Sequence, residues 1–170
     1  GSLWMWGYDM MADEEIGDGD WQLSRTPTKV MDGVSEVSIG HNGGSSCFAC
    51  IAAVKTDGSL WIWGSHDGNF GLPGEDSLFA NTPIKMMDGV AHISVGSSNI
   101  AVVKTDGSLW TCGENYQGQL GNGTQENSTS PVKIMENIAS VSAGPGFTIA
   151  VKEDGTVWSW GSNYNGELGN

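Results

Sequence analysis

The residues best suited to metal chemistry are a Cys-x-x-Cys pair and a run of carboxylates. Cys47 and Cys50 have the spacing of half a zinc site, but the only other cysteine is Cys112. We therefore expect buried or free thiols, with a disulfide as the alternative. Segment 13–20 holds five carboxylates, the ligands that Ca²⁺ prefers, but not at EF-hand spacing. We predict a solvated acidic loop, with calcium as the lesser alternative, and no bound metal or cofactor.

The three histidines do not suggest an active site. His41, His66 and His92 lie at different positions of a repeat that runs through the sequence. No serine, cysteine or carboxylate pair accompanies them in a nucleophile-and-base arrangement. We therefore predict that the protein is not an enzyme.

A short motif organises the whole chain. Residues 57–64 read Asp-Gly-Ser-Leu-Trp-Ile-Trp-Gly, and close copies lie at 1–7, 106–113 and 154–161. Spacings of about 50 residues are typical of propellers and other repeat arrays. The copies open on Gly1, Gly58, Gly107 and Gly155, which lie 57, 49 and 48 residues apart. We predict one repeat domain over 1–170, with units 1–57, 58–106 and 107–154 and a partial unit 155–170.

Each period contains four predicted β-strands. A Trp-bearing strand is followed by a Gly-rich loop, a Thr/Ser-Pro and a short strand, and then by two strands. In the second unit the last three are expected at 85–87, 90–95 and 100–103. The Asp-Gly pairs between the last strand and the next Trp strand predict antiparallel hairpins with type I′ turns, which need positive φ at both central residues.

Within Leu-Trp-x-Trp, the tryptophans point to one side of the strand and the alternate residues to the other. A strand that is apolar on both faces needs cover on both, as a propeller blade receives from its two neighbours. We therefore expect the tryptophans of the repeat to lie in the core.

On these residues the sequence resembles the regulator-of-chromosome-condensation repeat family. Residues 106–121 follow the family motif nearly throughout, and 161–169 keep its second half, whereas 64–71 and 7–17 are degraded copies. The resemblance implies an all-β propeller with blades of four antiparallel strands, about three blades plus one extra strand in this chain. The short units are most similar to bacterial secreted and surface members, or to a fragment of one.

Three blades leave a ring open and an apolar face exposed, so something must cover it. Either the chain is an excerpt of a longer propeller, or copies of it associate to complete a ring. The second alternative is supported by the sequence register, because 155–169 repeats the role of 1–17. The tail of one chain could then take the place of the head of another.

The family acts through protein contacts made by loops on one face of the ring, in nucleotide exchange on the Ran GTPase, β-lactamase inhibition and ultraviolet sensing. The resemblance therefore implies a non-catalytic protein–protein interaction module in an extracellular or cell-surface location, with the cytoplasm left open. The alternatives are a regulator of an enzyme, either an inhibitor of a hydrolase such as β-lactamase or a GTPase exchange factor, and a self-assembling architectural unit.

The formal net charge of −13 argues against binding to nucleic acid or to an anionic membrane and fits a basic protein surface better. No apolar run is long enough to span a bilayer. Aromatic residues in loops are the side-chain type enriched at binding hot spots, although they could equally pack on their own loops. Our candidate partner-binding residues are Trp21, Phe79, Tyr116, Tyr164, Asp18 and Asp20.

Overall fold

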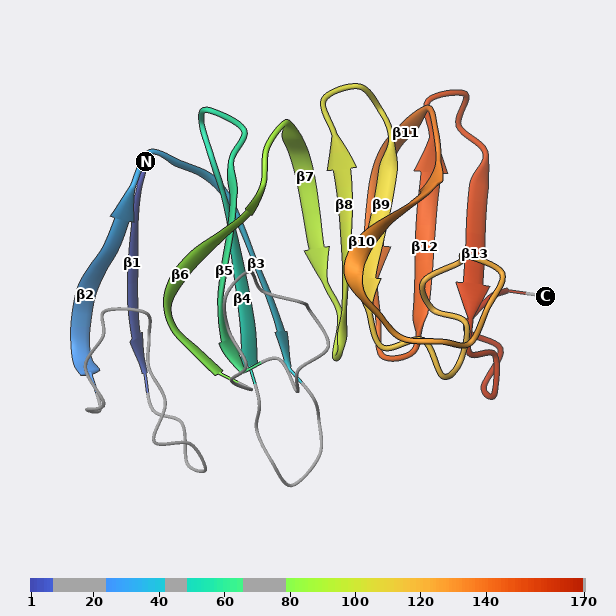
Figure 1. The fold of residues 1–170 in the computed structure, drawn as a ribbon, viewed down its shortest axis with the longest axis horizontal. Coiled ribbons are helices and arrows are strands. Elements are labelled where there is room, and N and C mark those ends of the chain that lie inside the picture. Colours follow the sequence, from blue (N-terminus) through green and yellow to red (C-terminus); the bar gives the residue numbers. More distant parts are fainter. Residues whose placement is uncertain (8–23, 42–48, 66–78, 170) are drawn as a thin grey trace.

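The computed structural model describes residues 1–7, 24–41, 49–65 and 79–169, which form β-strands and turns (Figure 1). None of these residues belongs to a helix long and apolar enough to cross a membrane. The strands are β1 (Ser2–Gly7), β2 (Ser24–Asp32), β3 (Val34–His41), β4 (Ala49–Lys55), β5 (Leu60–Ser65), β6 (Phe79–Met87), β7 (Val90–Val95), β8 (Asn99–Lys104), β9 (Leu109–Gly113), β10 (Ser128–Met135), β11 (Ile138–Ala143), β12 (Phe147–Lys152) and β13 (Val157–Gly161).

The described strands form four antiparallel sheets that stand side by side along the chain (Figure 1). The orders are β1-β2, β3-β4-β5-β6, β7-β8-β9-β10 and β11-β12-β13. The prediction of an all-β fold with four-stranded antiparallel blades is confirmed. The strands divide differently from the sequence units, however, because each Trp strand is the third strand of a sheet. The described strands therefore make two four-stranded blades, which lie between a first sheet of two described strands and a last sheet of three.

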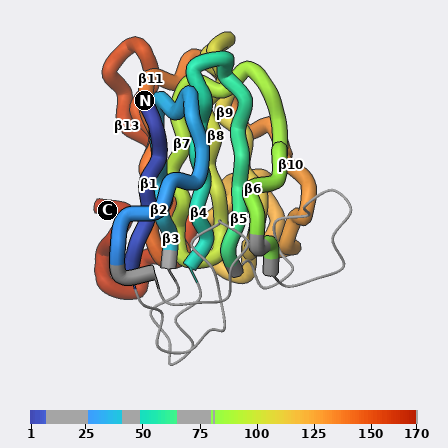
Figure 2. Tube along the Cα trace, turned by 90° about the vertical axis from the view of Figure 1, so that its left-hand side faces the viewer, coloured from blue at the N-terminus to red at the C-terminus, as the bar shows by residue number. Residues whose placement is uncertain are grey.

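The first strands of successive sheets lie against one another at one edge of the row, which Figure 2 shows from the side of the first sheet. Their approach is close enough to require glycine. A Cβ added to Gly40 would lie 1.9 Å from the Gly96 carbonyl oxygen, and one on Gly96 would lie 2.9 Å from that of Gly144. These three glycines occupy the same position of the repeat, so each junction between sheets is built alike.

Both faces of the Trp strands take part in packing, as predicted. Leu3 and Met5 pack against a core cluster that contains Leu60 and Ile62, while Trp63 is buried on the opposite face of its own strand. Burying such large apolar side chains contributes about 1.5–3 kcal/mol each. The core therefore runs between sheets rather than within one.

The expectation that every repeat tryptophan is core is wrong for the two end sheets. Trp4, Trp6 and Trp158 are at least half exposed. Trp4 and Trp6 lie on the side of the first sheet that no other described sheet covers. Trp158 belongs to the last sheet, which has three strands in the described residues. In the second sheet the fourth strand, β6, lies beside the Trp strand and pairs Lys85 with Trp61. Exposure at these positions follows from missing neighbours.

The Asp-Gly turns close antiparallel hairpins, but the predicted type I′ geometry is wrong. Gly58 has a φ of 80°, whereas Asn137 is the only described non-glycine residue with a positive φ. The Gly58 N–H donates to the Lys55 carbonyl and the Lys55 N–H to the Ser59 carbonyl, each at 2.9 Å. This is a three-residue loop that ends on a left-handed glycine. Asp57 keeps a negative φ, and its side chain accepts a hydrogen bond from the Ser59 N–H.

The proline-bearing strands are longer than predicted. β2, β6 and β10 include Pro27, Pro83 and Pro131, and in the first three sheets they form the outer edge. Proline cannot donate a hydrogen bond to a neighbouring strand and is therefore restricted to edges and bulges. The pairing between β9 and β10 is irregular around Pro131, between Ser128 and Val132.

A candidate protein-binding rim

The two ends of the sheets differ. The Asp-Gly turns lie at the upper end of the sheets in Figure 1, and they repeat with little change. The loops that follow the Trp strands, 114–127 and 162–169, lie at the lower end, which we call the lower rim. Segments 8–23, 42–48 and 66–78 join strand ends at this same end and lie outside the described residues.

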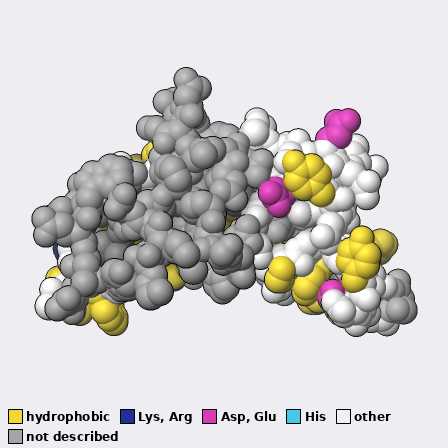
Figure 3. Space-filling model, turned by 90° about the horizontal axis from the view of Figure 1, so that it is seen from below, with side chains coloured by type: hydrophobic (Ala, Val, Ile, Leu, Met, Phe, Trp, Pro, Cys, Tyr) yellow, Lys and Arg dark blue, Asp and Glu magenta, His cyan; other side chains and the backbone are white. Residues whose placement is uncertain are grey.

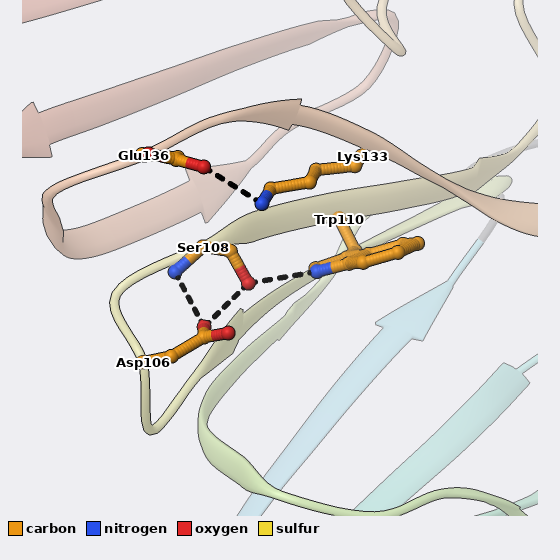
Figure 4. A network of polar contacts seen from close by, with 5 residues as sticks. All are labelled: Asp106, Ser108, Trp110, Lys133 and Glu136. Atoms are coloured by element: carbon orange, nitrogen blue, oxygen red, sulfur yellow. Dashed lines mark hydrogen bonds and ion pairs between the residues drawn. The ribbon is translucent and has the colours of Figure 1, made fainter.

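The upper end carries a cluster of polar contacts (Figure 4). Asp106 accepts hydrogen bonds from the hydroxyl and the backbone N–H of Ser108, at 2.5 and 2.9 Å. The Ser108 hydroxyl in turn accepts one from Trp110 Nε1 at 2.8 Å. Lys133 forms an ion pair with Glu136 at 2.8 Å. The hydrogen bonds from Ser108 hold the pKa of Asp106 below its ordinary value.

The same arrangement recurs in three copies, and in each a lysine Nζ lies 4.8–5.1 Å from the centroid of the tryptophan ring. Its polar groups satisfy one another, so we interpret the network as structural. The copies are Lys55, Asp57, Ser59 and Trp61; Lys104, Asp106, Ser108 and Trp110; and Lys152, Asp154, Thr156 and Trp158.

A buried asparagine holds the loop 114–127 of the lower rim in place. Asn115 is fully buried, and its Nδ2 donates to Asn122 Oδ1 and to the carbonyl of Thr124, each at 3.0 Å. Its Oδ1 accepts a hydrogen bond from the Leu120 N–H at 2.9 Å. One side chain thus fixes both halves of the loop, and the Tyr116 side chain next to it remains 68% exposed.

The loop after β13 repeats this design. The Leu168 N–H donates to Asn163 Oδ1 at 3.0 Å, as the Leu120 N–H does to Asn115. Tyr164 stands at the position of Tyr116 and is 88% exposed. Two tyrosines therefore lie on equivalent, hydrogen-bonded loops one blade apart, and most of each side chain is exposed.

The structure describes the other predicted site residues only in part or not at all. Phe79 is the first residue of β6 and pairs with Ser65, but its side chain lies outside the described part. Trp21, Asp18 and Asp20 lie in 8–23, which the structure does not describe. Their assignment to a binding site stays a prediction, as it does for Tyr116 and Tyr164.

The sequence analysis missed the acidic residues of the described rim. Glu114 and Glu126 flank the loop that presents Tyr116, and Glu126 is exposed. Figure 3 views the molecule from this end and shows hydrophobic and acidic side chains beside one another on the described part. The signal in the sequence was the placement of these acids within a loop that also carries an aromatic residue.

The thiols do not form a metal site in the described residues. Cys50 and Cys112 are free and buried, and burial raises the pKa of both, that of Cys112 to about 12. Cys47 lies outside the described residues. Across the part of the chain that is described, no three His, Cys, Asp or Glu side chains gather closely enough to hold a metal ion.

Stacked four-stranded antiparallel sheets with variable loops at one end define a segment of a β-propeller. The family model described as regulator of chromosome condensation (RCC1) repeat matches residues 106–151, and a second model of the same description matches 90–119 and 138–167. These repeats belong to the RCC1 repeat family.

Solved structures share the fold at low sequence identity. The human protein WBSCR16 superposes with a TM-score of 0.77 at 24% identity, covering 99% of this chain and 45% of its own. Saccharomyces cerevisiae Prp20p gives a TM-score of 0.74 at 20% identity, covering 95% and 39%. Yeast RCC1 (Prp20) bound to Kap60 gives 0.73 at 21% identity, covering 96% and 40%. The chain thus spans less than half the length of these proteins. No curated protein sequence matches it significantly.

Proposed function

We propose that this chain is a non-catalytic protein-interaction module whose lower rim binds another protein. The observation that carries the proposal is the pair of exposed tyrosines, Tyr116 and Tyr164, on equivalent loops one blade apart. Tyrosine is enriched among hot-spot residues. The hydrogen bonds of Asn115 and Asn163 hold both loops in place before binding, which reduces the entropy lost on association.

The charge points to a partner with a basic surface. The formal net charge is −13, and Glu114 and Glu126 lie beside the rim tyrosine Tyr116. Complementary charge steers encounter and selects partners, and salt screens it over about 10 Å at 0.1 M. We therefore expect binding to weaken as salt is added.

Two related structures support a protein as the type of partner. Yeast RCC1 (Prp20) has been crystallised with Kap60, and Prp20p is described with binding properties to Gsp1p and histones. Within the proposal, the partner is either a structural protein or an enzyme that the module regulates, such as a hydrolase or a GTPase. The proposal places the protein outside a bacterial cell or on its surface, on the basis of its short Trp-x-Trp-Gly units.

Affinity capture with matched variants tests the proposal. The immobilised chain would be compared with a Tyr116→Ala/Tyr164→Ala variant and with a Thr56→Ala/Thr105→Ala control, which changes two exposed side chains at the upper end. We expect the wild type and the control to capture a partner protein that the tyrosine variant does not capture. Equal retention by all three would contradict a lower-rim site. Measuring the catalytic rate of the captured protein then separates a structural partner from a regulated enzyme.

A further inference from the structure

We infer that the two exposed tyrosines of the lower rim, Tyr116 and Tyr164, each bind an arginine side chain of the partner protein. The guanidinium group lies flat on the tyrosine ring and donates hydrogen bonds to a glutamate of the same rim. The inference rests on the proposed function and deepens it, because it names the chemical group of the partner that the rim recognises.

The two tyrosine rings are open to a ligand and fixed in place. The Tyr116 side chain is 68% exposed and that of Tyr164 is 88% exposed. Their loops are held by Asn115 and Asn163, whose Oδ1 atoms accept backbone hydrogen bonds at 2.9 and 3.0 Å. The face of an aromatic ring attracts a cation, and in proteins this cation is more often arginine than lysine. Each ring is therefore a suitable surface for a guanidinium group.

At the upper end the chain supplies its own cations to aromatic rings, which it does not do at the lower rim. Three lysine Nζ atoms lie 4.8–5.1 Å from the centroids of tryptophan rings, and the other three lysines form ion pairs at 2.7–2.8 Å. The single arginine, Arg25, belongs to the first sheet, two sheets before the loop of Tyr116. A cation on the rim tyrosines therefore comes from another molecule. The stacked lysines are Lys55, Lys104 and Lys152, and the paired ones are Lys29, Lys85 and Lys133.

The charge of the two tyrosine loops is complementary to arginine. Loops 114–127 and 162–169 contain three glutamates and no lysine or arginine. Glu126 is exposed on the first loop. On the second loop, the backbone N–H and Nδ2 of Asn165 donate to the Glu167 carboxylate at 2.9 and 3.0 Å. The bond from the backbone N–H is the main reason that the pKa of Glu167 lies below its ordinary value, which keeps this carboxylate ionised at neutral pH.

A ring beside a carboxylate distinguishes arginine from lysine, although both carry one positive charge. The guanidinium group is planar and weakly hydrated, so it can stack on a ring while its N–H groups bond to a carboxylate. The lysine ammonium group is compact and strongly hydrated. Long-range attraction to an acidic surface is the same for both. A preference for arginine therefore reports contact with the rings rather than net charge.

Matched peptides test the inference directly. The probe is a short peptide in which arginine alternates with glycine, and its controls carry lysine or the uncharged isostere citrulline in place of arginine. By calorimetry we expect the wild type to bind the arginine peptide more tightly than either control. Loss of each ring in Tyr116→Ala/Tyr164→Ala should weaken arginine binding about 2- to 5-fold and remove the preference over lysine. Arginine side-chain protons of the bound peptide should shift upfield in NMR spectra, because they lie over the rings.

Failure of this inference can be told from failure of the rim proposal. Equal binding of the arginine and lysine peptides by the wild type would overturn the inference, as would an arginine preference that persists in the tyrosine variant. If the arginine peptide does not bind but a captured partner still requires both tyrosines, the inference is wrong and the rim proposal stands. A captured partner that does not require the tyrosines contradicts the rim proposal itself.

A pair of charge variants locates the contribution of the carboxylates. Glu126→Gln on the lower rim and Glu153→Gln at the upper end both change an exposed glutamate and alter the net charge equally. β13 has 5 residues and spans about 17 Å, whereas 0.1 M salt screens charges over about 10 Å. We therefore expect Glu126→Gln to weaken arginine-peptide binding about 1.5- to 5-fold and Glu153→Gln to leave it unchanged. Equal losses in the two variants would show that net charge drives binding and would overturn the inference.

Discussion

The Ser38 hydroxyl accepts a hydrogen bond from the Val95 backbone N–H at 3.0 Å, across the junction between the second and third sheets. Ser94 makes the same contact with Ala143 one junction later. Each serine lies two residues before a glycine at the closest approach of the strands. This side chain therefore fixes how far one blade is displaced along its neighbour, and so aligns the loops of the lower rim.

Removing this hydroxyl should loosen a junction. Ser94→Ala leaves the Ala143 N–H without its acceptor, and we expect a loss of about 1–2 kcal/mol in the free energy of unfolding, measured by urea denaturation. Ser140→Ala changes an exposed serine on β11 and serves as the control. Equal effects of the two substitutions would show that the contact does not hold the blades in register.

A side chain added where the first strands of two sheets meet should destabilise the protein more than one added at a turn. The Cβ of Gly40→Ala would lie 1.9 Å from a backbone oxygen, so the strands must separate, at a cost of about 3 kcal/mol. Gly166→Ala meets no neighbouring atom within 4 Å and only strains a φ of 82°, at about 1 kcal/mol. Thermal unfolding of both variants compares them, and a smaller effect at Gly40 would contradict the close approach.

The upper turns should lose stability in acid. Hydrogen bonds from Ser59, Ser108 and Thr156 lower the pKa of Asp57, Asp106 and Asp154 below the ordinary 3.8. A lowered pKa in the folded state gives stability that is present above about pH 4 and lost as the pH falls through the folded value. The urea midpoint should therefore fall below pH 4 more steeply in the wild type than in a variant with all three changed to Asn. If the urea midpoints of the wild type and the variant fall in parallel as the pH is lowered, the three carboxylates do not contribute this stability.

The two described thiols should be inert in the folded protein. Burial raises the pKa of Cys112 to about 12 and raises that of Cys50 as well, and only the thiolate reacts readily. In a Cys47→Ser variant, a thiol reagent at pH 8 should label neither cysteine until guanidinium unfolds the chain. Rapid labelling of the native variant would show that the sheets do not seal these side chains.

Much of this architecture could be predicted from the sequence, because the repeat is local. The Asp57-Gly58 hairpin and the two-sided Trp strand follow from residue types within a few positions. The turn type could not be predicted, since Asp57 satisfies the turn with its own side chain and leaves only Gly58 left-handed. The division into blades also escaped prediction, because the repeat has no intrinsic starting point and only strand pairing supplies one.

The site could be predicted less completely than the fold. Tyr116 and Tyr164 were identifiable as loop aromatics, but their exposure depends on Asn115 and Asn163, whose side chains bond to backbone several residues away. Their shared rim depends on the stacking of whole sheets. Neither relationship is encoded in a short motif of adjacent residues.

The most direct test of the proposed rim is the dissociation constant of the purified captured partner, measured by calorimetry for the wild type, the Tyr116→Ala/Tyr164→Ala variant and the upper-end control. Truncating a hot-spot tyrosine costs at least about 2 kcal/mol, so the tyrosine variant should bind at least about 30-fold more weakly, while the affinity of the control is unchanged. Binding within about twofold of the wild type in the tyrosine variant would contradict recognition by this rim.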